Sequence, residues 1–172
     1  MGVLFDYFAA PSDADAAGAI DRPLGPAEPT PTESGGLLSR WRRLEDDVST
    51  SGEAFPTVQA TGIDPVVQCG TLEALLTGRH YDQVTEDPRW GQVLVTSEAG
   101  DRLVGTLTDS LVDALARANP EDLTAVAGPW SRTEEFDGAG DPDLLAAVLR
   151  ELSDLAVSAR LRGWKVYSWT SV

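Results

Sequence analysis

The last quarter of the chain, Asp141 to Val172, constrains the fold more than any other stretch. Asp141 can cap a helix, Pro142 suits the first helical position, and Gly163 is well placed to end it. Residues 164–170 follow, with aromatic and β-branched types that are typical of a strand. The helix in between has apolar residues at steps of three and four, which predict one buried side: Leu145, Val148, Leu149, Leu152, Leu155, Ala156 and Ala159. We therefore expect a long helix that leads into a terminal core strand.

The first residues of the chain have a similar extended pattern. Residues 2–8 are mostly apolar or aromatic, which is typical of a strand that begins the fold. Alternation along a strand predicts Val3, Phe5 and Tyr7 on one face and Leu4 and Phe8 on the other. Since this strand and the terminal strand are apolar on both faces, we expect both to be central, to share one sheet and to be covered on two sides.

A second clear helix is predicted from Pro65 to Thr77. Asp64 precedes it as a cap and Gly78 follows its end. Its expected buried face consists of Val66, Cys69, Leu72, Leu75 and Leu76. In this position Cys69 is interpreted as a small apolar core residue.

Weaker patterns predict the remaining elements. These are a helix over 13–20 capped by Ser12, a helical turn over 81–84, a hairpin of 92–96 with 102–107, and helices over 110–118 and 119–128. Residues 21–36 are rich in Pro and Gly, and we expect a flexible insertion there. The fold class predicted for residues 1–172 is a single small α+β domain. Its few-stranded mixed sheet should include both termini and be packed by four to six helices.

The charge of the chain limits its partners. It has 28 acidic against 13 basic residues, a net charge of −15, so nucleic acid and anionic membrane surfaces are disfavoured and a basic partner is favoured. The basic cluster of residues 40–43 is followed by three acidic residues at 45–47, which favours intramolecular pairing. With one cysteine, no intramolecular disulfide can form, and no signal peptide or membrane span is evident, so we expect a cytoplasmic protein.

Short landmarks spread over most of the chain resemble a known family. They are Met1-Gly2 leading to Tyr7-Phe8, the stretch Leu72-Glu73-Ala74-Leu75-Leu76-Thr77-Gly78, and a long helix running into a terminal hydrophobic strand. Together they are similar to the YfbM-like family of uncharacterised bacterial proteins. The resemblance implies a small mixed α and β domain and brings no activity with it. The Pro-rich insertion and Val66-Val67, where an aromatic is expected, depart from the family pattern.

Catalytic and metal-binding patterns are scarce. His80 is the only histidine, so any His-dependent triad or dyad must use it, and no Gly-x-Ser-x-Gly elbow occurs. One His and one Cys do not make a zinc site, and no phosphate-binding glycine loop is present, so no cofactor and no metal are expected. Large aromatics bracket an Arg and two acids in residues 130–136, a composition that suits a recognition surface as well as a packed connection between helices.

Three interpretations follow. The leading one is a non-enzymatic interaction protein with a basic partner, for instance an immunity-type protein that blocks a basic toxin. The alternative is a small enzyme or ligand-binding domain with a pocket around His80, Trp130, Arg132 and Glu134. In a third, the terminal strand lies at a sheet edge and pairs across a homodimer. The candidate binding residues are His80, Tyr81, Trp130, Arg132, Glu134 and Glu135.

Overall fold

The structure is a computed structural model that describes residues 3–22, 24–28 and 54–172. The predicted basic cluster at 40–43 and its acidic neighbours lie outside these residues. The described elements, in chain order, are β1 (Leu4–Ala10), α1 (Asp13–Ala17), the 3-10 helix η1 (Gly18–Asp21), β2 (Thr57–Gln59), α2 (Val67–Thr77), α3 (Tyr81–Thr85), β3 (Val93–Thr96), β4 (Arg102–Thr106), α4 (Asp109–Arg117), α5 (Pro120–Ser131), the 3-10 helix η4 (Glu134–Phe136), α6 (Pro142–Arg162) and β5 (Lys165–Ser171).

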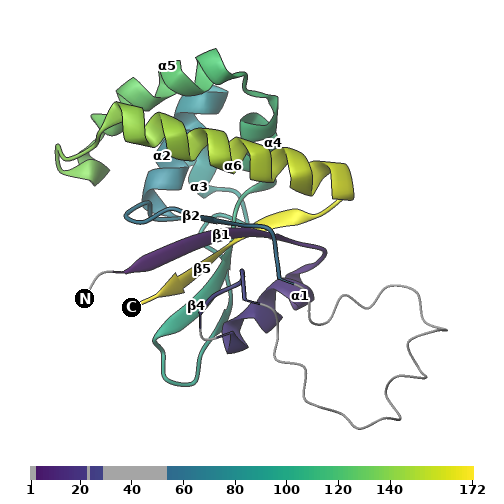
Figure 1. Cartoon of the computed structure of the whole chain (residues 1–172). Helices are drawn as coiled ribbons and strands as arrows, with labels where there is room; N and C mark the ends of the chain where they lie inside the picture. Colours follow the sequence, from purple (N-terminus) through teal and green to yellow (C-terminus); the bar gives the residue numbers. More distant parts are fainter. Residues whose placement is uncertain (1–2, 23, 29–53) are drawn as a thin grey trace, which may run out of the picture.

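The five described strands form one sheet in the order β2-β1-β5-β4-β3. The first and last strands pair along their whole length, with Asp6 opposite Trp169 and Tyr7 opposite Ser168, so the two described chain ends lie side by side in Figure 1. This confirms an α+β fold whose sheet includes both termini. The expectation of a mixed sheet is corrected, because all four pairings are antiparallel. The long helix α6 carries the chain back across the sheet, so β5 runs opposite to β1.

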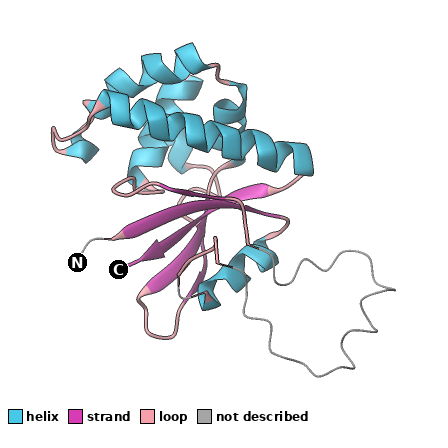
Figure 2. Ribbon diagram, viewed as in Figure 1, coloured by secondary structure: helices cyan, strands magenta, loops and turns pink. Residues whose placement is uncertain are grey.

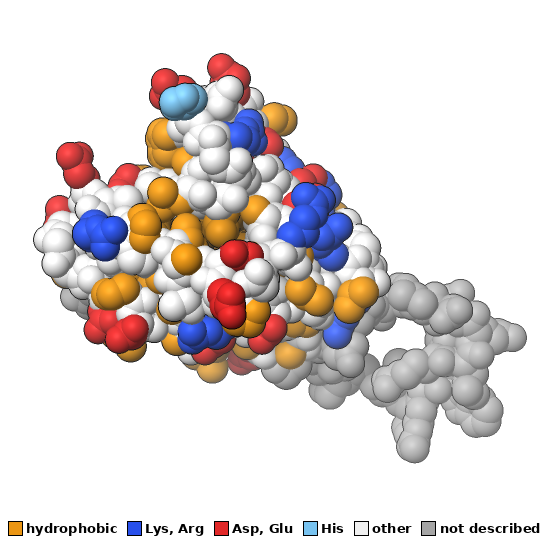
Figure 3. All heavy atoms as spheres, turned by 90° about the horizontal axis from the view of Figure 1, so that it is seen from above, with side chains coloured by type: hydrophobic (Ala, Val, Ile, Leu, Met, Phe, Trp, Pro, Cys, Tyr) orange, Lys and Arg blue, Asp and Glu red, His pale blue; other side chains and the backbone are white. Residues whose placement is uncertain are grey.

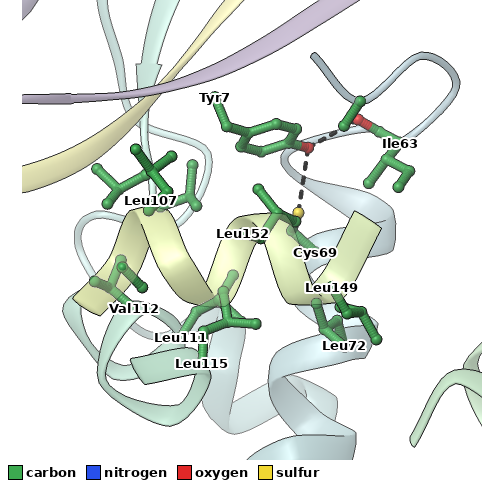
Figure 4. Packing of buried hydrophobic residues seen from close by; sticks show 14 of the residues in the cluster. Tyr7, Ile63, Cys69, Leu72, Leu107, Leu111, Val112, Leu115, Leu149 and Leu152 are labelled. Carbon is green, nitrogen blue, oxygen red and sulfur yellow. Dashed lines mark hydrogen bonds between the residues drawn. The ribbon is translucent and has the colours of Figure 1, made fainter. Parts of the chain in front are cut away.

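Helices α2 to α6 form a layer over one face of the sheet, and α1 lies on the other face (Figures 1 and 2). The larger core lies between the sheet and the helical layer. There Tyr7 of β1 points toward α2, and its hydroxyl donates to the Ile63 carbonyl at 2.8 Å and lies 3.3 Å from Cys69 Sγ (Figure 4). The predicted buried side of α6 packs on this core, with Leu149 and Leu152 fully or almost fully buried.

A smaller core covers the other face of the sheet. It joins Phe8, Val104, Tyr167 and Trp169 to Ala16, Ala19 and Ile20 of α1 and η1. Part of the predicted flexible insertion belongs to this layer, because Gly25 and Pro26 are buried against the sheet. Within the predicted flexible insertion at 21–36, the described residues Gly25 and Pro26 are thus buried rather than exposed.

The caps predicted for α6 are confirmed. Asp141 Oδ1 accepts hydrogen bonds from the backbone N–H groups of Asp143 at 2.9 Å and Leu144 at 3.2 Å, which satisfies two free donors of the first turn. Gly163 ends the helix with φ of 67°, a left-handed conformation that glycine adopts without strain. The chain therefore turns directly from α6 into β5.

Two helices differ from their predicted form. In α2, Leu75 was expected to be buried but is exposed, whereas Gln68 and Glu73 are buried. The helix packs against both α4 and η4, so its buried face differs from the predicted one. Helix α5 does not end near Gly128 but continues through Pro129 to Ser131. The continuation places Trp130 in the core, with no exposed surface.

The strand β5 is the central strand of the sheet and lies between β1 and β4. The terminal strand therefore has no free edge with which to pair across a homodimer, and that basis for a dimer is removed. Among the described residues, no helix has both the length and the apolar composition needed to cross a membrane.

Candidate functional site

Trp130 is a structural residue rather than part of an exposed surface. Its indole Nε1–H donates to the Gln68 carbonyl at 2.9 Å, and its ring packs edge-on against Phe136 with centroids 5.2 Å apart. Its own backbone carbonyl accepts a hydrogen bond from the Thr133 hydroxyl at 2.9 Å. These contacts attach the end of α5 and the turn η4 to α2.

The same contacts hold Glu135 in place. The side chain of Gln68 donates to the Glu135 backbone carbonyl at 3.2 Å, so one residue of α2 is bonded both to Trp130 and to η4. The Thr71 hydroxyl, one turn further along α2, lies 2.8 Å from Glu135 Oε1. Backbone and side chain of Glu135 are therefore both fixed against α2, which preorganises its carboxylate.

The Glu135 carboxylate is charged and incompletely paired. Burial by itself raises its pKa, but the hydroxyl groups of Thr133 and Thr71 and its own backbone amide lower the pKa below the usual value for glutamate. The carboxylate is thus ionised at neutral pH. Its second oxygen, Oε2, is buried and has no hydrogen-bond partner among the described residues, although buried carboxylate oxygens normally have one.

A pocket of about 330 Å³ lies beside this carboxylate and is here called the Glu135 pocket. Six residues line it: Thr71, Ala74, Leu75, Arg79, Tyr81 and Glu135. Ala74 and Leu75 give it an apolar wall, and Leu75 is available for this because α2 does not bury it in the core. The Tyr81 ring packs edge-on against Trp90, with centroids 6.2 Å apart. Partial burial and the negative charges of Glu135 and Asp64 raise the pKa of the Tyr81 hydroxyl, which remains protonated.

The positive charge of Arg79 is already compensated. Its Nη1 lies 3.3 Å from Oε1 of the buried Glu73 and 3.4 Å from the Ser110 hydroxyl, and its Nη2 donates to the Gln83 carbonyl at 2.7 Å. Glu73 needs this cation because it is buried, and its other oxygen accepts a hydrogen bond from Thr108. The uncompensated charge of the Glu135 pocket is therefore the negative charge of Glu135.

The structure brings together two of the six predicted residues, Tyr81 and Glu135. His80 is exposed at the start of α3, where its backbone N–H donates to Gln83 Oε1 at 3.1 Å, and its pale-blue side chain lies on the surface in Figure 3. Arg132 and Glu134 are also exposed and are not among the residues that line the pocket. Trp130 donates to Gln68, whose side chain in turn donates to Glu135. Trp130 itself has no exposed surface with which to touch a ligand.

Sequence reasoning missed Thr71, Ala74, Leu75 and Arg79 as lining residues. Arg79 precedes His80 and Tyr81, and the three follow the glycine that ends α2, so this loop was a detectable signal. Thr71 and Ala74 give no such signal, because small residues are common on helices and the sequence does not show that η4 packs beside them.

Other chemistry is not assembled in the described part of the chain. Burial raises the pKa of the Cys69 thiol to about 12, so this cysteine is an inert core residue, as predicted. No three His, Cys, Asp or Glu side chains of the described residues are grouped as metal ligands.

Comparisons with protein-family models, with curated proteins and with solved structures found no match to this chain. The resemblance to the YfbM-like family stays a prediction from the residues that carry it.

Proposed function

We propose that this chain is a non-enzymatic binding protein whose Glu135 pocket receives a cationic side chain of a basic partner. One observation carries the proposal: the ionised carboxylate of Glu135 is held rigidly by α2, lines an open pocket and has no ion pair with a described residue. An arginine or lysine head group supplies the opposite charge and N–H donors for a carboxylate. The apolar wall of Ala74 and Leu75 suits the methylene groups of such a side chain.

The charge of the whole chain supports a basic partner. A net charge of −15 speeds association with a cationic surface and repels nucleic acid and anionic lipid. A basic toxin blocked by an immunity-type protein is one partner of this kind. Catalysis is the weaker alternative, because the Tyr81 pKa is raised and the lowered pKa of Glu135 makes its carboxylate a weak base toward the Thr71 hydroxyl that donates to it.

The proposal is tested by titrating the labelled protein with arginine amide and following backbone NMR signals. Citrulline amide, which has nearly the same shape and the same α-amino group but no charge on its side chain, is the matched ligand control. We expect arginine amide to shift the signals of Thr71, Ala74 and Tyr81 at low salt, with citrulline amide binding about tenfold more weakly or worse. Added salt should weaken the arginine complex.

Two neighbouring residues provide a matched pair of variants. Glu135→Gln removes the charge of the pocket, and Glu134→Gln removes the same charge from an exposed position one residue away. We expect Glu135→Gln to lose the preference for arginine over citrulline and Glu134→Gln to keep it. Equal effects of the two variants would mean that arginine amide responds only to the overall charge, and the proposal would then be wrong.

A further inference from the structure

A second hollow borders the other side of η4. It has a volume of about 360 Å³ and is here called the α6 pocket. Its apolar wall includes Ile63, Phe136 and three residues of the first two turns of α6: Leu144, Leu145 and Val148. Glu135 lines both pockets, so both border the same turn of chain.

The α6 pocket presents apolar surface that the fold itself does not cover. Leu144 is 67% exposed at the first turn of α6, and Val148 is only partly buried on the next. Figure 3 shows apolar side chains exposed among carboxylates on the helical side of the molecule. Exposed apolar surface inside a hollow with a polar rim is typical of a binding site.

The charge around this hollow selects its occupant. Asp137 and Asp141 line it together with Glu135, and no Lys or Arg does. A second copy of this chain carries the same net charge of −15 and would be repelled. A segment in which an apolar residue stands close to a basic one is attracted by the same groups.

We propose that the two pockets form one bipartite site: a basic residue of the partner enters the Glu135 pocket and a nearby apolar residue enters the α6 pocket. This inference rests on the proposed function and adds to it the sequence character of the partner segment. The shared residue Glu135 places the two bound side chains a few residues apart at most. The rigid connection of η4 to α2 through Gln68 keeps the two pockets in register.

The test uses short peptide amides in place of the partner. Phe-Arg, Arg-Phe, Phe-Gly-Arg and Arg-Gly-Phe amides are titrated into the full chain, each beside the same peptide with Ala in place of Phe. We expect at least one Phe peptide to bind about tenfold more tightly than its Ala counterpart. It should shift the NMR signals of Leu144 and Val148 as well as those of Thr71 and Tyr81.

Helix α6 supplies its own control. Leu144→Ser removes an exposed leucine that lines the α6 pocket, and Leu161→Ser removes a still more exposed leucine, 85% accessible, near the other end of the helix. Leu144→Ser should abolish the advantage of Phe over Ala and leave arginine amide binding unchanged. Leu161→Ser should change neither.

The outcomes separate this inference from the proposed function. If arginine amide binds through Glu135 but no Phe peptide gains over its Ala counterpart, the bipartite site is overturned and the proposed function stands. If Phe gains equally in wild type and Leu144→Ser, the apolar residue binds elsewhere and the bipartite site is likewise overturned. If the charge of arginine makes no difference in wild type, the proposed function fails, and the bipartite site fails with it.

Discussion

At the scale of single residues, two carboxylates show how local partners decide what burial does. Glu135 is partly buried, yet hydroxyl and amide donors keep its pKa low and its charge in place. Asp6 of β1 is 5% exposed, and its carboxylate has no hydrogen bond or ion pair with any described residue. Gly25 packs closely on it, so that a methyl group at Gly25 would lie 2.7 Å from Asp6 Oδ2. Burial therefore raises the pKa of Asp6.

The raised pKa of Asp6 predicts a stabilising substitution. The folded protein binds this proton more tightly than the unfolded chain, so the free energy of unfolding falls as pH rises through the two pKa values, and the full penalty is present above both. Asp6→Asn removes the charge with little change of shape. We expect its melting temperature to exceed that of wild type by about 2–4 °C at neutral pH.

The same comparison at about pH 3 should show no gain, because Asp6 is then protonated in both folded and unfolded chains. Thermal unfolding followed by circular dichroism measures both. A melting temperature of Asp6→Asn below that of wild type at neutral pH would contradict this account.

At the scale of elements, α2 positions the candidate site through a residue with no side chain. Gly70 lies in the helix where Tyr81 and Trp90 pack on its backbone. A methyl group there would lie 2.9 Å from Trp90 Nε1 and 3.0 Å from Tyr81 Cε2. A glycine costs a helix stability relative to alanine, so its presence here reflects close packing with the two rings.

Gly70→Ala is therefore expected to destabilise the protein, although alanine is the better helix former. Displacing the two rings should cost up to about 3 kcal/mol, against a gain of about 1 kcal/mol in helix propensity. Because Tyr81 is a wall of the Glu135 pocket, arginine amide should also bind more weakly. Urea unfolding and the NMR titration measure the two effects.

Gly18→Ala is the matched control for this prediction. Gly18 has a helical φ of −62°, and nothing lies near the position of an added methyl group. We expect this substitution to be neutral or slightly stabilising. If Gly70→Ala behaves like Gly18→Ala, the rings are free to move and Gly70 does not position Tyr81.

At the scale of the whole molecule, a charged cluster ties together segments far apart in the chain. Asp13 of α1 accepts hydrogen bonds from the Tyr167 hydroxyl of β5 at 2.8 Å and from Arg89 at 3.2 Å. Arg89 also donates to the Leu107 carbonyl at 3.3 Å and lies 3.9 Å from Asp109 of α4. The cluster thus joins α1, on one face of the sheet, to the start of the helical layer on the other.

Asp13→Asn should show the pH dependence opposite to that of Asp6→Asn. The Tyr167 hydrogen bond lowers the Asp13 pKa, burial opposes this, and Arg89 lowers it further, so the net shift is downward. Its contribution to stability is present above the unfolded pKa and is lost as pH falls through the lower folded pKa. Because Asp13 is half exposed, we expect a loss of only about 1–2 °C at neutral pH.

Thermal unfolding at neutral pH and near pH 2 checks this prediction, with no difference from wild type expected at the acidic end. An equal loss at both pH values would show that the amide disturbs packing and that the charge of Asp13 is not the cause.

Much of the fold was predictable, because its signals are local. The periodicity of α6, its caps at Asp141 and Gly163, and the two-sided apolar pattern of β1 and β5 all arise within short stretches. The candidate site was predicted only for Tyr81 and Glu135, which stand in loop-rich stretches with unusual composition. Of the two interpretations of residues 130–136, a recognition surface and a packed connection between helices, Trp130 fits the second, because it packs on Gln68 and Phe136 in a helix that continues past Pro129.

The sequence by itself determined that this chain folds into an acidic α+β domain with both termini in its sheet, since helix periodicity, caps and strand alternation depend on neighbouring residues. Only the tertiary structure decided that every strand pairing is antiparallel and that Leu75 faces a pocket. It also decided that the charge of Arg79 is compensated while that of Glu135 is not. The reason is that the surroundings of Glu135 depend on contacts such as that with Thr71, 64 residues away in the chain, and no local pattern encodes that meeting.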